Sequence, residues 1–187
     1  MPQTYRDITG FTTKYEKVSE FPANAKRLVG QFSSLGVDNV KEIIYSEFVP
    51  YEGEDDEAYN EVDIEIEVDA EDAAKNKPLG FKSKLENELK NVGKYLNIDF
   101  VYIYTRYTNK EAFAKKFLKQ LKAHLKTTEY GPKIHSIGFN PQGVSVPEIR
   151  VTKKRDAWIL NNSRLKEYIQ EYLISIGYPN IKIYIVN

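Results

Sequence analysis

The sequence predicts an α+β fold, written as a tandem duplication of one α-β-β-α-β unit, with an antiparallel or mixed sheet and the helices packed on one face. The main observation is an internal repeat: residues 163–187 show the same apolar pattern as residues 83–107 without a gap. A shared pattern of this length is typical of a repeated structural unit. We therefore expect two similar halves, residues 1–107 and 108–187, packed as one compact body.

The aligned positions agree in character over both a helix and a strand. The matched pairs are Leu85 with Leu165, Leu89 with Ile169, Val101 with Ile181, Ile103 with Ile183 and Tyr104 with Tyr184. A second match places the helix at 22–36 on a helix that starts near residue 110. Each half resembles a ferredoxin-like unit, βαββαβ, without its first strand. The two sheets could lie side by side or merge into one larger sheet.

The first half begins with residues 4–18, which mix β-formers and threonines and indicate a strand or an extended arm. Pro22 and a recurring apolar face predict the helix at 22–36, which Gly36 ends. Residues 40–48 read as a strand, and an acidic loop follows it. We expect the N-terminal segment to supply the strand that the first unit lacks.

Residues 61–69 show the clearest alternation in the chain. The apolar positions are Val62, Ile64, Ile66 and Val68, and the acidic positions are Glu61, Asp63, Glu65, Glu67 and Asp69. Because side chains alternate across a strand, one face is apolar and the other acidic. We interpret the acidic row as a face that binds a partner. A solvated face that discourages sheet edges from pairing, and a site for a hard cation, are the alternatives.

A loop at residues 70–80 is expected to lead to a helix at 82–96, with Ser83 as its N-cap. Residues 99–107 form the strand that ends the first half. Its aromatic side chains Phe100, Tyr102 and Tyr104 fall on one side of that strand.

The second half opens with Asn109 as the cap of a long helix, which Gly131 and the next proline end. Strands follow at 133–139 and 148–152. A helix opened by Ser163 runs to Gly177, and residues 180–186 form the last strand. The lysines on the outer side of the long helix are Lys115, Lys119, Lys122 and Lys126.

Charge divides unequally between the halves although the chain has no net charge. Residues 1–93 hold 11 basic and 20 acidic residues, and residues 94–187 hold 16 basic and 7 acidic residues. The four lysines, with Lys153, Lys154 and Arg155 beside Trp158, are interpreted as a basic face that binds a partner or phosphate. The alternative is that the two halves simply face each other within one fold.

The chain lacks the patterns that catalysis or a cofactor would require. Cysteine is absent, and the two histidines, His124 and His135, stand alone. Phosphate loops, nucleophile elbows and histidine zinc motifs do not occur. We therefore expect no enzyme activity, no cofactor and no metal. Without a long apolar run or a signal segment, we expect no membrane partner and an intracellular location.

These observations favour a non-catalytic structural or assembly protein that makes protein–protein contacts. Opposite charges on the two halves would let it bind other protein subunits, or copies of itself head to tail. A viral component fits this character, such as part of a phage tail, neck or baseplate, located in the host cytoplasm or in the particle. The alternative function is nucleic-acid binding through the basic half.

Overall fold

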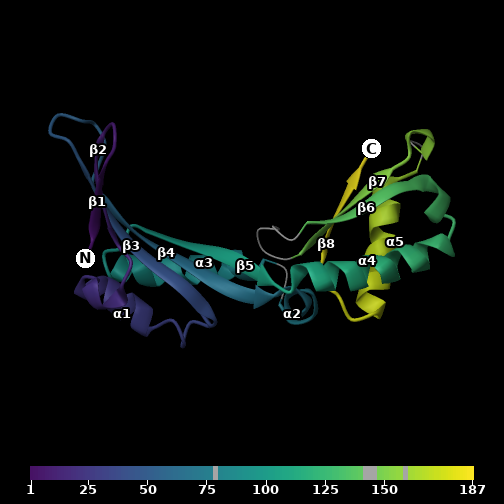
Figure 1. The fold of residues 1–187 in the computed structure, drawn as a ribbon, viewed down its shortest axis with the longest axis horizontal. Coiled ribbons are helices and arrows are strands. Elements are labelled where there is room, and N and C mark those ends of the chain that lie inside the picture. Colours follow the sequence, from purple (N-terminus) through teal and green to yellow (C-terminus); the bar gives the residue numbers. More distant parts are fainter. Residues whose placement is uncertain (78–79, 141–146, 158–159) are drawn as a thin grey trace. The chain divides into compact units, whose positions relative to one another are not determined.

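The computed structural model of the chain describes residues 1–77, 80–140, 147–157 and 160–187. The described part holds five α-helices and two separate sheets, one of β1 to β5 and one of β6 to β8, which confirms an α+β fold (Figure 1). The helices are α1 (Ala23–Gly30), α2 (Ala70–Asn76), α3 (Phe81–Tyr95), α4 (Lys110–Lys126) and α5 (Asn162–Ser175). The strands are β1 (Gln3–Arg6), β2 (Gly10–Tyr15), β3 (Val40–Pro50), β4 (Tyr59–Asp69), β5 (Phe100–Thr108), β6 (Ile134–Asn140), β7 (Glu148–Lys153) and β8 (Lys182–Val186).

Residue contacts divide the chain into two compact units. Unit 1 consists of Met1–Glu67 and Lys82–Arg106, and unit 2 consists of Val68–Phe81 and Tyr107–Asn187. The segment at 68–81, which the sequence placed with the first half, thus groups with the second unit. Each unit carries its own sheet and its own buried core.

The sheet of unit 1 has the strand order β1-β2-β3-β4-β5. The first four strands pair antiparallel with their neighbours. At the start of β4, the backbone N–H of Asn60 donates to Asp99, just before β5, at 2.9 Å. At the end of β4, Asp69 accepts from Asn109, just after β5, at 2.9 Å. Both contacts join equivalent ends, so β4 and β5 run in the same direction.

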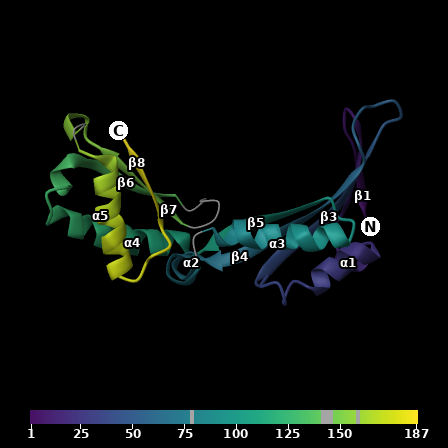
Figure 2. The same cartoon turned by 180° about the vertical axis from the view of Figure 1, so that it is seen from behind.

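Alternating burial fixes which face of this sheet meets the helices. Val62 and Ile64 in β4 and Val101 in β5 are fully buried. A Cβ placed on Gly93 of α3 would lie 3.2 Å from Val101, so α3 packs directly on that side of the sheet. Figure 1 shows the strands in front of α3, and the reverse view in Figure 2 brings α3 to the front. The opposite face carries the alternate side chains of β4 and β5.

The sheet of unit 2 has the order β6-β7-β8. β6 and β7 are antiparallel, whereas β7 and β8 are parallel. The ring of Phe139 in β6 lies 5.6 Å from that of Phe113 in α4, so α4 covers the face to which Phe139 belongs. His124 of α4 stacks on Tyr172 of α5 at 3.7 Å between ring centroids, which places the two helices side by side.

The helices that precede β5 and β8 end in the same way. After α3, Asn97 has φ 57° and the N–H of Ile98 donates to the carbonyl of Gly93 at 2.9 Å. After α5, Gly177 has φ 91° and the N–H of Tyr178 donates to the carbonyl of Leu173 at 2.8 Å. A left-handed residue followed by this long-range bond is the Schellman motif. Asn97 and Gly177 correspond to each other in the alignment of residues 83–107 with 163–187, and so do the donors and acceptors of the two hydrogen bonds.

Three local predictions differ from the structure. The segment predicted as a loop at 70–80 contains α2, because Asp69 accepts the N–H of Asp72 at 3.0 Å and caps a helix rich in alanine. Asn161, rather than Ser163, caps α5. Ser83 lies inside α3, which begins at Phe81, so it is not the cap.

The N-terminal segment forms a β-hairpin instead of one strand or an arm. β1 and β2 pair antiparallel, and the turn between them closes through the N–H of Asp7, which donates to the carbonyl of Gly10 at 2.8 Å. A Cβ on Gly10 would lie 2.3 Å from the carbonyl oxygen of Val49, so only glycine fits where β2 meets β3. Across the described ranges, none of the helices is both long and apolar enough for a membrane span.

Candidate functional site

The uncovered face of the unit 1 sheet gathers most of the acidic residues predicted to bind a partner. We call it the acidic–aromatic face, and it consists of Glu42, Tyr59, Glu61, Asp63, Glu65, Phe100, Tyr102 and Tyr104. Register places Glu61 opposite Ser46 and Asp63 opposite Ile44, so these side chains share one side of the sheet. The same pairing sets Glu65 opposite Glu42. Two neighbouring strands thus present carboxylates to the same side.

Aromatic rings extend across three strands of this face. Tyr59 stacks on Phe48 at 5.1 Å and meets the edge of Phe100 at 5.4 Å, and Phe100 stacks on Tyr102 at 6.2 Å between centroids. Tyr104, the next ring along β5, is 54% exposed, and Phe100 is 40% exposed. These rings contact one another within the sheet face but stay partly exposed to solvent. Such partly exposed aromatic rings are well suited to pack against a protein partner.

Burial raises the pKa values of the two central carboxyl groups, Glu61 and Asp63. Desolvation, followed by the charge of Asp63, raises the pKa of Glu61 to about 7. Desolvation also raises the pKa of Asp63, against the opposing effects of a Glu61 hydrogen bond and Lys14. The Oδ1 atom of Asp63 is buried and has no hydrogen-bond partner within the described residues. The pair therefore holds its negative charge at an energetic cost.

A shallow hollow of about 340 Å³ lies over the same residues. Its lining joins Asp63 and Glu65 to Tyr104 and Ile44. Desolvation, then the charges of Asp63 and Glu61, raise the pKa of Tyr104, which shows how closely ring and carboxylates lie. The hollow can accept a positively charged or aromatic group that the face itself does not supply.

The last two residues of the predicted acidic row behave differently. Glu67 forms an ion pair with Lys41 at 2.9 Å, and this hydrogen bond lowers the pKa of Glu67. Asp69 belongs to unit 2, where it caps α2 and accepts from Asn109. The structure therefore brings Glu61, Asp63 and Glu65 together, whereas Asp69 has a structural role.

The predicted basic residues also divide. The exposed ones are Lys115, Lys119, Lys122, Lys126, Lys154 and Arg155. Lys153 is buried, and its ammonium donates to the carbonyl of Leu160 at 3.1 Å. It is therefore not part of the basic face as predicted. Its position follows from the strand alternation that also buries Ile149 and Val151. Trp158 lies outside the described residues.

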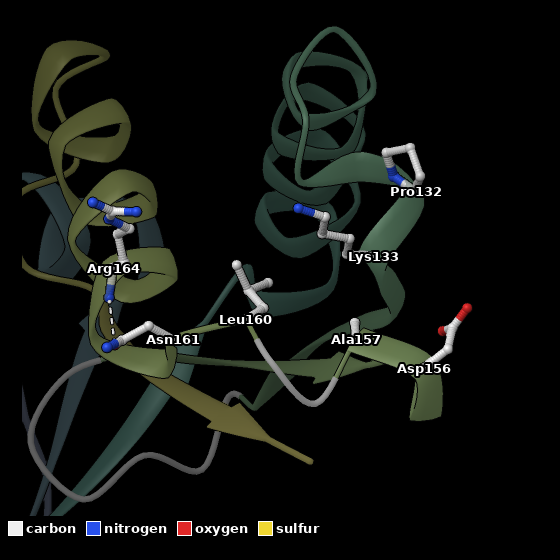
Figure 3. A pocket seen from close by; sticks show the side chains of 7 residues that line it. All are labelled: Pro132, Lys133, Asp156, Ala157, Leu160, Asn161 and Arg164. Carbon is white, nitrogen blue, oxygen red and sulfur yellow. Dashed lines mark hydrogen bonds between the residues drawn. The ribbon is translucent and has the colours of Figure 1, made fainter.

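A cavity of about 600 Å³ lies beside the start of α5 in unit 2. Figure 3 shows Lys133 reaching toward α5 and Asp156 pointing away from it. The side chain of Asn161 already accepts the N–H groups of Ser163 and Arg164, at 2.9 and 3.2 Å. Because this cap satisfies the helix end, the cavity does not require a bound anion to complete it.

The two histidines belong to different elements, α4 and β6. His124 stacks on Tyr172, and its Nε2 lies 3.0 Å from the hydroxyl of Tyr168, so it joins α4 to α5. His135 lies exposed in β6. Over the described ranges, no group of three or more His, Cys, Asp or Glu residues could hold a metal ion.

Sequence reasoning missed Glu42 and Tyr59 as members of the acidic–aromatic face. Both lie at the ends of strands whose pairing partners could not be read from the alternation alone. The aromatic side of β5 was visible in the sequence, but its position next to the acidic side of β4 depends on the parallel pairing of these strands. Comparison with protein-family models, with curated proteins and with solved structures finds no match to this chain.

Proposed function

We propose that the chain is a non-catalytic structural or assembly protein and that its acidic–aromatic face docks a basic surface of another protein subunit. The observation that carries this proposal is the row of exposed rings beside desolvated carboxylates, which form no ion pair among the described residues although Lys14 lies close enough to act on Glu61 and Asp63. Protein interfaces favour tyrosine and arginine, because flat groups bury much area at little loss of freedom.

The partner group that fits this face best is an arginine. A guanidinium can stack on Tyr104 while its N–H groups donate to Asp63 and Glu65. A nearby positive charge favours the ionised carboxylate, and so would offset the cost of holding Glu61 and Asp63 charged. A phosphate would be repelled from the same place, which favours a protein over a nucleic acid here.

We further propose that the two halves arose by duplication of one α-β-β-α-β unit. The order α1-β3-β4-α3-β5 matches α4-β6-β7-α5-β8, and each set contains an antiparallel pair followed by a strand that is parallel to the second. The matching Schellman motifs support the same origin. The added β1–β2 hairpin extends only the first sheet.

Opposite charges on such repeated units support assembly into larger structures. Heterologous contacts between negative and positive surfaces generate rings or filaments. We therefore place the protein among viral components, as a tail, neck or baseplate part of a phage, acting in the host cytoplasm or in the particle. The charge division and the uncovered sheet face support this placement.

The experiment titrates a short peptide of alternating arginine and tryptophan into the protein by calorimetry at low salt. Replacing Glu61 and Glu65 with glutamine should weaken binding about tenfold, because the charge-assisted hydrogen bond to Glu65 and the negative charge of Glu61 are lost. Phe100→Ala with Tyr104→Ala should weaken it by a similar factor without changing the charge. Equal affinity for all these variants and the wild type would contradict the proposed face.

The matched control removes the same charge from a different place. Glu54→Gln with Asp55→Asn lies in the exposed loop after β3 and should change the affinity by less than about twofold. If the loop variant weakened peptide binding more than the face variants do, the peptide would be binding acidic groups in general. That result would contradict the proposal.

Nucleic-acid binding through unit 2 is the second candidate. It is favoured by the exposed row Lys115, Lys119, Lys122 and Lys126, which forms no ion pair among the residues that the structure describes. Binding to a double-stranded DNA oligonucleotide would fall steeply with salt, and replacing two of these lysines would reduce the slope by about two. No binding at low salt would exclude this candidate.

A further inference from the structure

A second surface, on unit 2, forms a groove between α4 and the edge of the sheet. The groove has a volume of about 220 Å³, and its apolar lining comes from Leu125 of α4 and from Ile134 and Ile137 of β6. Lys122 and Lys126 lie along its α4 side. A narrow apolar groove with a cationic rim fits an extended acidic segment.

The β6 side of the groove is a sheet edge. Among the described residues β6 pairs with β7 alone, so every second N–H and C=O of β6 faces away from the sheet. Such an edge can accept an added strand from another chain. Gly131 lets the segment before β6 approach α4, because a Cβ there would lie 2.7 Å from the carbonyl oxygen of Leu125.

The same chain carries a segment that is complementary to this groove. We call Glu52–Glu57 the acidic loop; it is exposed throughout and holds five carboxylates. None of these carboxylates forms an ion pair within the described ranges. Beyond the hydrogen bond from Glu54 to Tyr51, the described residues show no backbone hydrogen bond for Asp55 or Asp56. This part of the loop can therefore pair with a strand edge.

We propose that the acidic loop of one copy binds in the groove between α4 and β6 of a second copy and adds as a short strand to β6. Its carboxylates then meet Lys122 and Lys126, and backbone hydrogen bonds hold it along the edge. The contact is head to tail, so it can repeat from copy to copy. It extends the proposed assembly role to a contact of the chain with itself, on surfaces other than the acidic–aromatic face.

Charge exchange between two variants tests this contact. One variant carries Lys122→Glu and Lys126→Glu, and the other carries Asp55→Lys and Asp56→Lys. Sedimentation velocity at low salt should show association of the wild type with rising concentration, and about tenfold weaker association of each variant alone. An equal mixture should associate again, because each loop then meets a groove of opposite charge.

The control variant carries Lys115→Glu and Lys119→Glu, which make the same charge change on α4 outside the groove. It should associate as the wild type does. A wild type that stays monomeric, a mixture that fails to associate, or a control that behaves like the groove variant would each overturn the proposal. Loss of DNA binding in the groove variant, without any self-association of the wild type, would assign the groove to nucleic acid instead.

The self-association test can fail or succeed independently of the peptide-binding test of the proposed function. A monomeric wild type that still binds the arginine–tryptophan peptide through Glu61 and Glu65 leaves the acidic–aromatic face standing and removes only the self-contact. Self-association that survives loss of the acidic–aromatic face, and fails with the groove charges reversed, supports the contact independently.

Discussion

Strands β3-β4-β5 of the first sheet have the same order and directions as β6-β7-β8 of the second, but the two sheets differ on their uncovered faces. In unit 1, β4 presents Glu61, Asp63 and Glu65 beside the rings of β5. In unit 2, β7 presents Glu148, Arg150 and Thr152, and Arg150 pairs across the sheet with Tyr184 of β8. The same backbone plan therefore carries an acidic, aromatic face in one unit and a face of mixed charge in the other.

The comparison teaches which residues fix the fold and which are free to vary. Leu89 and Ile169 lie at matched positions of α3 and α5, and both are fully buried. Side chains of this kind specify the unit, because they are the ones removed from water. Side chains on the uncovered faces need not be apolar for the unit to fold. We therefore expect the units to differ in function at these faces.

The largest effect should come from the matched core positions. Leu89→Ala and Ile169→Ala should each lower the free energy of unfolding by about 2–5 kcal/mol, through lost burial and the cavity that remains. Urea unfolding measures both. Ile174→Ala, on the same helix as Ile169 but 53% exposed, is the control and should cost less than about 0.5 kcal/mol. A loss at one matched position only would break the equivalence of the units.

The second-largest loss of stability should come from replacing the buried Lys153. Lys153→Ala removes the donor to the Leu160 carbonyl and some apolar stem, and should cost about 1–3 kcal/mol. Lys154→Ala, exposed at the next position, should remain within about 0.5 kcal/mol of the wild type. Thermal unfolding compares the two variants. Equal costs would contradict the inward orientation of Lys153.

The matched helix ends offer a smaller effect that separates the two units. Gly177→Ala should cost about 1–2 kcal/mol, because alanine resists a positive φ. Asn97→Gly should be neutral or slightly stabilising at its φ of 57°. Chemical unfolding of the two variants checks this. A strong loss for Asn97→Gly would show that the asparagine side chain, rather than the backbone, ends α3.

The smallest effect concerns pH. Glu61 has a raised pKa in the folded chain, so the folded state holds its proton more tightly than the unfolded state, and stability falls as pH rises from about 4.5 through about 7. Glu61→Gln should therefore gain on the order of 1 kcal/mol relative to the wild type at pH 8.5 compared with pH 4.5, after allowance for solvent screening. Urea midpoints at both pH values measure it. Glu54→Gln, in the acidic loop, is the control, and an equal gain there would argue against a local cause.

Much of the fold could be predicted because burial alternates visibly in the sequence. The apolar row of β4 follows from a local pattern. The helix predicted at 22–36 is shorter in the structure, because α1 ends at Gly30 and a series of turns continues to Gly36, which does have a positive φ. The short helix α2 escaped prediction, because its cap by Asp69 depends on geometry at the end of a strand. The burial of Lys153 could have been predicted, because it alternates with Ile149 and Val151 on one side of β7. Its positive charge instead favoured an exposed position.

The candidate site was predicted only in part for a related reason. Alternation identifies the acidic side of β4, yet it does not tell which strand lies next to it. The parallel pairing of β4 with β5 brings Tyr104 to Asp63 and Glu65, and this pairing connects segments that are separated by two helices. Long-range pairing of this kind leaves no local pattern in the sequence.

The most direct test of the central claim is to locate the arginine–tryptophan peptide on the protein by NMR. Amide resonances of an isotope-labelled chain are followed during the titration. The account predicts shifts that concentrate in β4 and β5 of unit 1, around Asp63, Glu65 and Tyr104. Shifts that concentrate in the acidic loop or along α4, with β4 and β5 unchanged, would contradict it.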